Sequence, residues 1–247
     1  MRTIRIHHSG PLASGALLPL DERSALHLLR VLRLKAGAPV VVFDGQGLEH
    51  DAVLANGHNS RLSLHIGLAR RALPKSPLSI TLAQGISRGE RMDYAIQKAT
   101  ELGVQFIAPL LCERSVVKLD AEQAAKKLTH WGGIASAASE QSGRADVPYI
   151  VQPIRLEEHL ARAVAANDAR LRLVLDPTCQ TGPSSLPADL HDVELLIGPE
   201  GGLSDTELDL AGRAGYRSLR LGPRVLRTET AAAAAIAVLQ ALHGDLK

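Results

Sequence analysis

Residues 195–208, LLIGPEGGLSDTEL, carry the strongest indication of the fold class. The first residues are typical of a buried β-strand, which ends in the loop GPEGG (198–202). Ser204 then caps a new helix, with Glu207 completing a capping box. Glycines at the carboxyl end of a strand permit left-handed backbone dihedrals and close approach of a ligand, and ligands of open α/β sheets bind at such ends. The stretch therefore predicts a parallel α/β sheet, and its loop is either a binding loop or a tight structural turn.

A second loop of the same kind follows a later strand. LGPRVLRTETAAAA, residues 221–234, turns through Gly222 and Pro223 into a helix that we expect Thr228 to cap. Two such loops at two strand ends can converge on one ligand. Neither contains a P-loop lysine or a GxGxxG pattern, which disfavours nucleoside triphosphates and dinucleotides. An adenosine with an amino-acid tail, held by backbone amides and carbonyls, fits better than a polyphosphate.

The rest of the second part of the chain alternates predicted strands and helices, as α/β proteins do. Residues 78–85 predict a buried strand, 90–103 a helix and 104–111 the next strand, which together form a βαβ unit of a parallel sheet. Further helices are predicted over residues 121–141, 156–166, 204–214 and 229–243, and further strands over 171–176, 193–198 and 218–222.

The first part of the chain is different and is β-rich. Strand-like runs such as PVVVF (39–43) and RLSLHIGLA (61–69) are separated by the turn signals DGQG and ANGHNS. Residues 21–37 predict one amphipathic helix, with Asp21 as its cap and Gly37 as its end. Pro74 and Pro77 in ALPKSP mark the best domain boundary, because proline disrupts both helices and central strands.

Composition favours an ordinary globular protein with an uneven charge. Of 247 residues, 45% are hydrophobic and 22% charged, which excludes wholesale disorder. Residues 1–75 hold 10 Lys and Arg against 5 Asp and Glu, a net +5, whereas residues 76–247 hold 18 against 21, a net −3. The basic excess would attract a polyanion, although a solvated basic surface explains it equally well. The low aromatic content, 2%, leaves few rings for base stacking.

The cysteines, histidines and hydropathy of the sequence indicate whether the protein binds metal or enters a membrane. Cys112 and Cys179 are isolated and in no metal or redox spacing, and the histidines show no metal spacing, so we predict no metal. No stretch reaches the roughly 18 apolar residues needed to cross a bilayer. We therefore expect a cytoplasmic protein with no membrane partner.

The two glycine loops together resemble a known family. IGPEGGLS (197–204) and LGPRVLRTETA (221–231) resemble the cofactor-binding loops of the SPOUT methyltransferases, and the best match is the bacterial 16S ribosomal RNA uracil-N3 methyltransferase family. Supporting matches occur in the family's order over nearly the whole chain: HLLRVLRLKAG (27–37), VVFDGQG (41–47), AIQKATELGV (95–104), ERSVVK (113–118) and SEQSGR (139–144) with the nearby VP.

The resemblance implies a fold, a cofactor and partners. Residues 1–75 would form a PUA-like RNA-binding β-barrel, and residues 76–247 a SPOUT α/β domain with a parallel sheet and a C-terminal trefoil knot. The chain would form a homodimer with the active site near the subunit interface, and would methylate N3 of a uridine in 16S rRNA or the small ribosomal subunit. The cofactor S-adenosylmethionine would contact Ile197, Gly198, Pro199, Glu200, Gly201, Gly202, Leu221, Gly222, Leu226, Arg227 and Thr228.

The chemistry suggests catalytic candidates within the family-like motifs. Uracil N3 carries a proton and has no free lone pair, so the protein must supply a base or a cation that lowers its pKa, together with orientation. Arg114, Arg144 and Arg227 are the candidate cations, and Glu140 and Glu229 the candidate proton acceptors. Glu229 equally fits a role in stabilising the first turn of its helix, and Glu200 could simply fix the glycine loop.

The expected RNA contacts lie in the basic first third of the chain. We expect Arg30, Arg33 and Lys35, together with Arg70 and Arg71, to meet phosphates, and a solvent-facing surface is the alternative for each. Two rival functions share the loops: a SPOUT enzyme acting on another rRNA or tRNA position, and an RNA-binding assembly factor without turnover.

Overall fold

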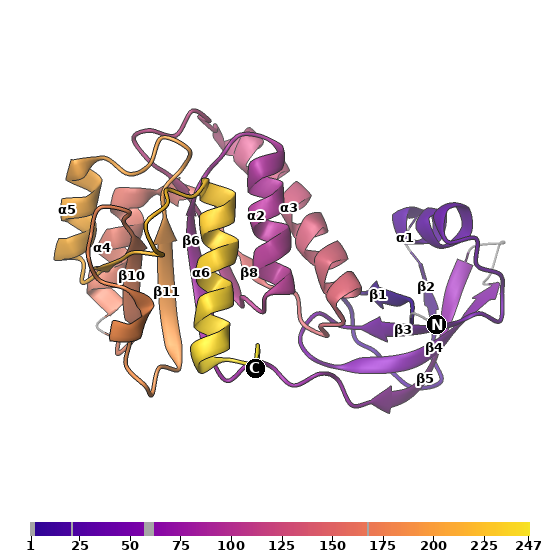
Figure 1. Cartoon of the computed structure of the whole chain (residues 1–247). Coiled ribbons are helices and arrows are strands. Elements are labelled where there is room, and N and C mark those ends of the chain that lie inside the picture. Colours follow the sequence, from indigo (N-terminus) through magenta and orange to yellow (C-terminus); the bar gives the residue numbers. More distant parts are fainter. Residues whose placement is uncertain (1–2, 21, 57–61, 167) are drawn as a thin grey trace. The chain divides into compact units, whose positions relative to one another are not determined.

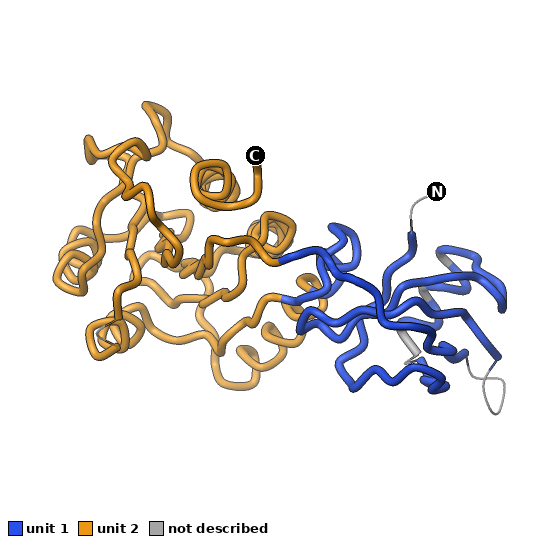
Figure 2. The backbone as a smooth tube through the Cα atoms, turned by 90° about the horizontal axis from the view of Figure 1, so that it is seen from below, with its two compact units in different colours: residues 1–74, 136–147 blue, residues 75–135, 148–247 orange. Residues whose placement is uncertain are grey.

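The computed structural model describes residues 3–20, 22–56, 62–166 and 168–247. By its internal contacts the chain divides into two compact units, shown in blue and orange in Figure 2. One comprises the chain up to Pro74 together with Ser136–Val147, and the other comprises Lys75–Ala135 and Pro148–Lys247. The segment 136–147 is thus grouped with the first unit, although the sequence-based division placed it after the boundary.

The first unit is built on one five-stranded sheet. Its strands run in the order β1-β3-β4-β5-β2, with β1 parallel to β3 and the other pairs antiparallel. Apolar side chains such as Val42, Leu54 and Leu64 alternate into its core. The element bounds are β1 Arg5–His7, β2 Leu17–Pro19, α1 Glu22–Leu26, η1 His27–Val31, β3 Pro39–Phe43, β4 Glu49–Asn56 and β5 Leu62–Arg70.

The helix predicted over residues 21–37 is wrong in its length. Helix α1 continues only through the π-helical turn η1 and ends at Val31. Arg33 takes a left-handed conformation, with φ 51°, and the backbone N–H of Leu34 donates to the carbonyl of Leu28 at 2.9 Å. This six-residue closure ends a helix as a C-terminal glycine would, so Gly37 serves the following turn instead. The predicted cap, Asp21, lies outside the described residues.

The second unit is a parallel sheet, as predicted. The strand order is β12-β10-β11-β6-β7-β8, with β9 also paired to β7, and all of these strand pairs are parallel. The element bounds are β6 Ser79–Gly85, α2 Glu90–Glu101, β7 Phe106–Leu111, α3 Ala121–Ser142, β8 Tyr149–Ile150, β9 Ile154–Arg155, α4 Leu156–Ala166, β10 Leu171–Leu175, η3 Pro183–Ser185, β11 Asp192–Ile197, α5 Asp205–Arg213, β12 Arg217–Leu219 and α6 Thr228–His243. The short strands β8 and β9 and the turn η3 carry too little pattern to be predicted.

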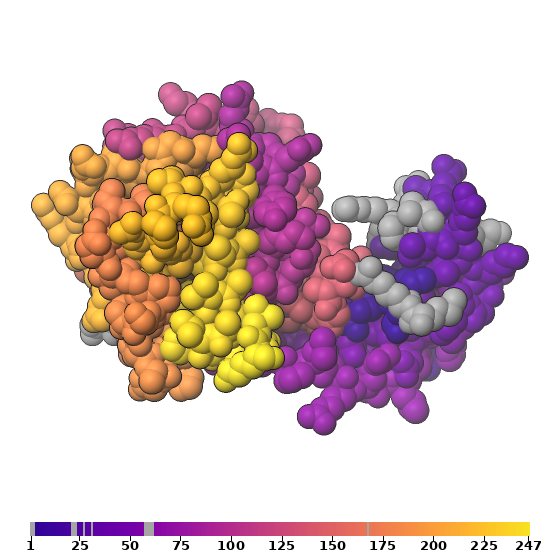
Figure 3. Space-filling view, in the orientation of Figure 1, coloured from indigo at the N-terminus to yellow at the C-terminus, as the bar shows by residue number. Residues whose placement is uncertain are grey.

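Helices cover both faces of this sheet. Buried residues of α4 and α5, among them Leu160 and Ala211, pack with Leu110, Val174 and Leu196 of the strands. On the other face α6 and α2 lie side by side (Figure 1), and their side chains form one continuous surface in Figure 3. Burial on both faces explains why the strands read as continuous apolar runs. None of the described helices combines the length and apolarity needed to cross a membrane.

Candidate cofactor cavity and active site

A cavity of about 490 Å³ opens where three neighbouring parallel strands end. Its walls are the segments that follow β10 (residues 175–177), β11 (197–202) and β12 (219–229), with Arg91 and Ala231 at its margin. The carboxyl edge of a parallel sheet is where such folds bind ligands. The structure brings every residue predicted to contact the cofactor to this cavity: Ile197, Gly198, Pro199, Glu200, Gly201, Gly202, Leu221, Gly222, Leu226, Arg227 and Thr228.

The loop after β11 requires glycine at one position within it and at one position on the neighbouring strand. A Cβ placed on Gly85, at the end of the neighbouring strand β6, would lie 2.5 Å from the backbone nitrogen of Pro199, so only glycine permits this approach. Gly202 has φ 70°, a left-handed conformation that disfavours other residues. The predicted capping box is confirmed: the Glu207 N–H donates to Ser204 Oγ at 3.2 Å, and the Ser204 N–H donates to Glu207 Oε2 at 2.9 Å.

Thr228 joins the two loops and does not cap α6 as predicted. The N-cap residue is Arg227, and Thr228 is the first residue of the helix. The Thr228 hydroxyl donates to the carbonyl of Gly198 at 2.7 Å and accepts from Gln84 Nε2 at 2.9 Å. Since both partners are on the central strands β6 and β11 or their loops, the hydroxyl is taken up by the sheet and is not free for a cap.

Glu200 ties the first loop to the start of α2. Its Oε1 accepts from the backbone N–H of Arg88 at 2.9 Å and from Arg91 Nη1 at 3.1 Å. Partial burial favours the neutral form, but these hydrogen bonds and the charge of Arg91 lower the pKa of the Glu200 carboxyl below its usual value. Glu200 is therefore a charged residue of the cavity wall. It also fixes the glycine loop, which was the structural role considered for it from the sequence.

The predicted catalytic residues fall into two groups. Arg227 and Glu229 line the cavity. Arg114 supports it from outside, because its Nη1 donates to the carbonyls of Gly201, at 3.3 Å, and Leu203, at 3.2 Å.

Glu140 and Arg144 belong to the first unit and are not among the cavity-lining residues. Glu140 Oε1 accepts from the backbone N–H of His7 at 2.9 Å. Arg144 makes two hydrogen bonds to Asp146, at 2.8 and 3.2 Å. Both side chains thus have partners within that unit.

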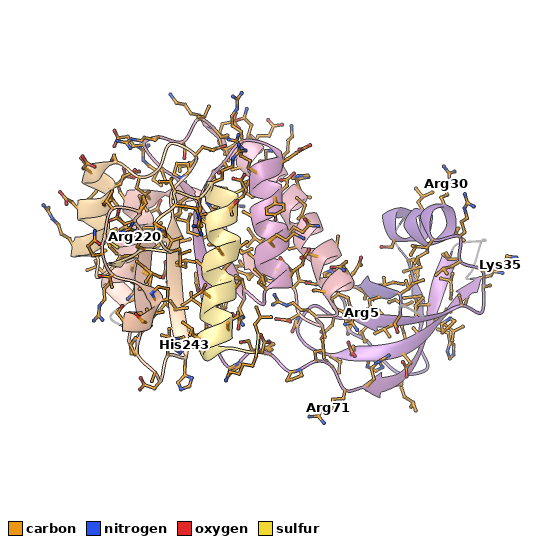
Figure 4. All side chains as sticks on the ribbon, in the orientation of Figure 1. Arg5, Arg30, Lys35, Arg71, Arg220 and His243 are labelled. Atoms are coloured by element: carbon orange, nitrogen blue, oxygen red, sulfur yellow. The ribbon has the colours of Figure 1, made fainter. Side chains whose placement is uncertain are left out.

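All five predicted RNA-binding residues are exposed, and four of them make no ion pair among the described residues. Arg30, Lys35 and Arg71 extend away from the ribbon of the first unit in Figure 4, and Arg33 is exposed as well. Arg70 differs, because its guanidinium pairs with Glu49 at 3.1 Å and with Asp51 at 3.0 Å. These carboxylates compensate the charge of Arg70, which weakens its case as a phosphate ligand.

Sequence reasoning missed the third wall of the cavity. Asp176 follows β10 directly and accepts hydrogen bonds from the backbone and hydroxyl of Thr178 and from Ser218. Burial favours the neutral form, but these hydrogen bonds together outweigh it and lower the pKa of the Asp176 carboxyl below its usual value. Arg220 supports the last loop by donating to the carbonyl of Gly222 at 2.9 Å. The sequence did contain a signal: the run LRLVLDP (171–177) is an apolar strand followed by a proline, as the other two strand exits are followed by Pro199 and Pro223.

Comparison with protein families defines the class. Residues 74–240 match the RNA methyltransferase domain, and residues 20–66 match the RNA methyltransferase PUA domain. The chain therefore belongs to the RNA methyltransferases that carry a PUA domain. Among the described residues, no group of three or more His, Cys, Asp or Glu side chains is arranged to hold a metal ion.

Individual relatives define the family more narrowly. The chain is 32% identical to ribosomal RNA small subunit methyltransferase E of Buchnera aphidicola, over 99% of this chain and 98% of that protein. A crystal structure of ribosomal RNA small subunit methyltransferase E from Neisseria gonorrhoeae, bound to S-adenosyl methionine, matches with a TM-score of 0.90 and 35% identity over 100% of both chains. A Legionella pneumophila protein solved with bound SAM matches with a TM-score of 0.93 and 42% identity, again over 100% of both chains. The chain belongs to the ribosomal RNA small subunit methyltransferase E family, which confirms the resemblance seen in its motifs.

Proposed function

We propose that this chain transfers a methyl group from S-adenosylmethionine to N3 of a uridine in 16S ribosomal RNA. The observation that carries the proposal is the cavity formed by three strand ends, two of them glycine loops that lack a phosphate-clamping lysine. The family membership supports the reaction class. The relatives' names give the small-subunit ribosomal RNA as their substrate, and two related structures hold the cofactor.

The cavity fits the cofactor in size and chemistry. Its volume of about 490 Å³ lies within the roughly 300–1,000 Å³ of small-molecule sites. Apolar side chains such as Leu175, Leu219 and Leu226 would cover an adenosine, while backbone groups of residues 197–202 and 221–228 would bind its polar edges. Glu229 Oε2 is buried and has no hydrogen-bond partner among the described residues, so it can accept a donor from a bound molecule. When bound, S-adenosylmethionine supplies an electrophilic methyl group on a sulfonium.

The residues of the cavity would prepare the uracil for attack. Arg227 can place its guanidinium beside O2 or O4 and stabilise the anion that forms when N3 loses its proton. Glu229 can accept that proton, because its Oε2 has no hydrogen-bond partner among the described residues and is available as a base. Arg114 acts as a positioning residue through Gly201 and Leu203. Glu140 and Arg144 are the further candidates, Glu140 as a proton acceptor and Arg144 as a cation.

The proposal includes the architecture that the resemblance implies. Residues 1–75 would be a PUA-like β-barrel for RNA, and residues 76–247 a SPOUT domain whose C-terminal chain is threaded into a trefoil knot. The enzyme would work in the cytoplasm on free 16S rRNA or on the small subunit.

A homodimer is the expected state in solution. The outward side of α6 carries the half-buried Ala233, Ala234 and Val238, whose small size allows another helix to approach closely, and Tyr94 of α2 is 45% exposed beside it. Sedimentation at micromolar concentration should give the mass of two chains. A fully active monomer would contradict a site shared between subunits.

The exposed cations of the first unit should supply RNA affinity. The variant Arg30→Gln/Arg33→Asn removes two charges, and Asn tolerates the left-handed conformation of Arg33. RNA affinity should fall, and the slope of log K against log salt should become shallower by about 0.7–0.9 for each lost phosphate contact. A filter-binding series over salt concentrations measures both.

The control for that experiment is Arg155→Ala/Arg162→Ala, which removes the same amount of positive charge. Arg155 directly precedes α4 and its side chain is 78% exposed, and Arg162 lies on α4 and its side chain is 66% exposed. S-adenosylmethionine affinity should be unchanged in both variants. If the Arg30/Arg33 variant binds RNA like the control, this helix is only a solvated surface.

The function itself is tested by mass mapping of methylated uridines in ribosomal RNA from cells that lack this protein. One 3-methyluridine in 16S rRNA should disappear and return with the wild-type gene. Loss of a methyl group at another rRNA or tRNA position would favour the rival SPOUT activity. Cofactor binding without methyl transfer to any RNA would favour an assembly factor.

A further inference from the structure

The second unit has another cavity, separate from the cofactor cavity and lined by cations. It measures about 520 Å³ and lies along the N-terminal half of α3 and the residues before it. Lys126 pairs with Glu122 at 2.6 Å and His130 with Asp93 at 2.9 Å. Within the part of the chain that the structure describes, no carboxylate pairs with Lys118 or Lys127. The lining residues, which we call the lysine groove, are Lys118, Leu119, Gln123, Lys126, Lys127 and His130.

A smaller niche of about 140 Å³ adjoins the lysine groove and shares Leu119 and Lys127 with it. Its walls are residues 86–89 after β6, together with Met92, Val117 and Trp131. Two of its side chains hold hydrogen-bond donors without a partner in the described structure: Ser87 Oγ and Trp131 Nε1. Ser87 is 4% exposed and Trp131 1% exposed, so bulk water does not readily satisfy them. Buried polar groups without partners are uncommon in folded proteins and call for a ligand or another explanation.

The niche is connected to the cofactor loop through two neighbouring residues. Arg88, a wall residue of the niche, donates its backbone N–H to Glu200, and Arg91 both binds Glu200 and lines the cofactor cavity. A molecule in the niche would therefore lie close along the chain to the residues that form the methyl-transfer site.

We propose that the lysine groove and its niche bind single-stranded RNA. They would form the part of the substrate site that the second unit contributes, next to the cavity that holds the methyl donor. The proposal rests on the proposed function. Lys118 and Lys127 would contact phosphates, and the niche would take a nucleotide group rich in acceptors, because the indole N–H can only donate and the serine hydroxyl is free to donate. Unpaired RNA fits best, since its bases can turn out of the stack toward a protein pocket. RNA recognition would then not be confined to the basic first unit.

Charge removal tests the lysine groove. Lys118→Ala/Lys127→Ala should weaken binding of a uridine-containing 16S rRNA fragment by about 10-fold or more at low salt and reduce the salt slope by about 1.5. S-adenosylmethionine affinity, measured by calorimetry, should stay at the wild-type value. The matched control is Arg155→Ala/Arg162→Ala, which removes two charges from the other face of the sheet. RNA affinity and slope equal to the control would overturn the proposal.

Ser87→Ala and Trp131→Phe test the niche separately from folding. Each removes an unpartnered donor, so a purely structural role predicts thermal stability for Ser87→Ala at or above that of the wild type. A substrate role predicts a higher KM for RNA in both variants, and for Ser87→Ala it predicts this at unchanged or higher stability. Unchanged KM in both would remove the niche from the site.

Trp131 also reports binding directly, because it is the chain's single tryptophan. Titration of the wild-type protein with single-stranded oligouridylate should change its fluorescence in a saturable way, and the Lys118/Lys127 variant should need a higher concentration. No change in the wild type would overturn the proposal. This readout needs no methyl transfer, so it separates failure of the groove from failure of the proposed function, which would show as absence of methylation of any RNA by the wild type.

Discussion

Arg227→Ala should lower the methylation rate at saturating RNA and cofactor by about 100- to 1,000-fold. Removing one donor that stabilises a developing anion has an effect of that order in other enzymes. Arg227 lines the cavity at the N-terminus of α6, and no carboxylate among the described residues pairs with its guanidinium. A cation that stabilises the uracil anion acts mainly in the transition state, so kcat should fall while KM for RNA changes little. Single-turnover methyl transfer measures the step.

Arg224→Ala is the matched control for that prediction. Arg224 lies three residues earlier, is exposed, and also lines the cavity, so it carries the same charge in the same loop. Its loss should reduce the rate far less. If both variants slow the reaction equally, Arg227 contributes only to the general potential of the loop. Arg227→Lys should recover part of the rate, since the charge remains but the planar fork is lost.

Gly201→Val should weaken the binding of S-adenosylmethionine by about 30-fold or more in a folded protein. A Cβ at this position would lie 2.9 Å from Cβ and 3.2 Å from the carbonyl oxygen of Arg114, so the loop must shift away from its support. The shift would misplace backbone groups that bind the cofactor. Losing two such hydrogen bonds, at roughly 1–1.5 kcal/mol each, corresponds to a Kd increase of about 30- to 100-fold or more. Calorimetry measures the Kd, and circular dichroism verifies the fold.

The control here is Gly212→Val on α5, where an added Cβ meets nothing within 4 Å. It should bind the cofactor like the wild type. Wild-type affinity of the Gly201 variant would remove the loop 197–202 from the cofactor site.

The sequence predicted the second unit well because each of its elements carries its own signal. The strands are continuous apolar runs, the loops are marked by glycine and proline, and Ser204 with Glu207 forms a capping box that the structure confirms. The cofactor candidates converge on one cavity for the same reason, since neighbouring parallel strands end at one edge. What local pattern could not show was the position of Asp176 at that edge, which depends on the order of strands.

The errors lie where long-range contacts override local preference. Thr228 is a good N-cap residue by type, but its hydroxyl binds Gly198 and Gln84, which are distant in the chain. The predicted helix over residues 21–37 stops early because Arg33 adopts a left-handed conformation that no propensity scale assigns to arginine. Leu29, an apolar residue within the predicted helix, is 46% exposed. Segment 136–147, which contains Glu140 and Arg144, joins the first unit through contacts such as that of Glu140 with His7.

The hydrogen bond between Thr228 and Gly198 also determines when, during synthesis of the chain, the cavity can form. The cavity takes its walls from segments after β10, β11 and β12, and the last of these leads into α6, the final helix of the chain. During synthesis the residues of β6 and β11 leave the ribosome before Thr228, because they precede it in the chain. A nascent or truncated chain that ends before residue 219 lacks one whole wall and the hydroxyl that joins it to the sheet. The ability to hold a ligand there is thus acquired only at the close of translation, so incomplete copies cannot compete with finished ones for it.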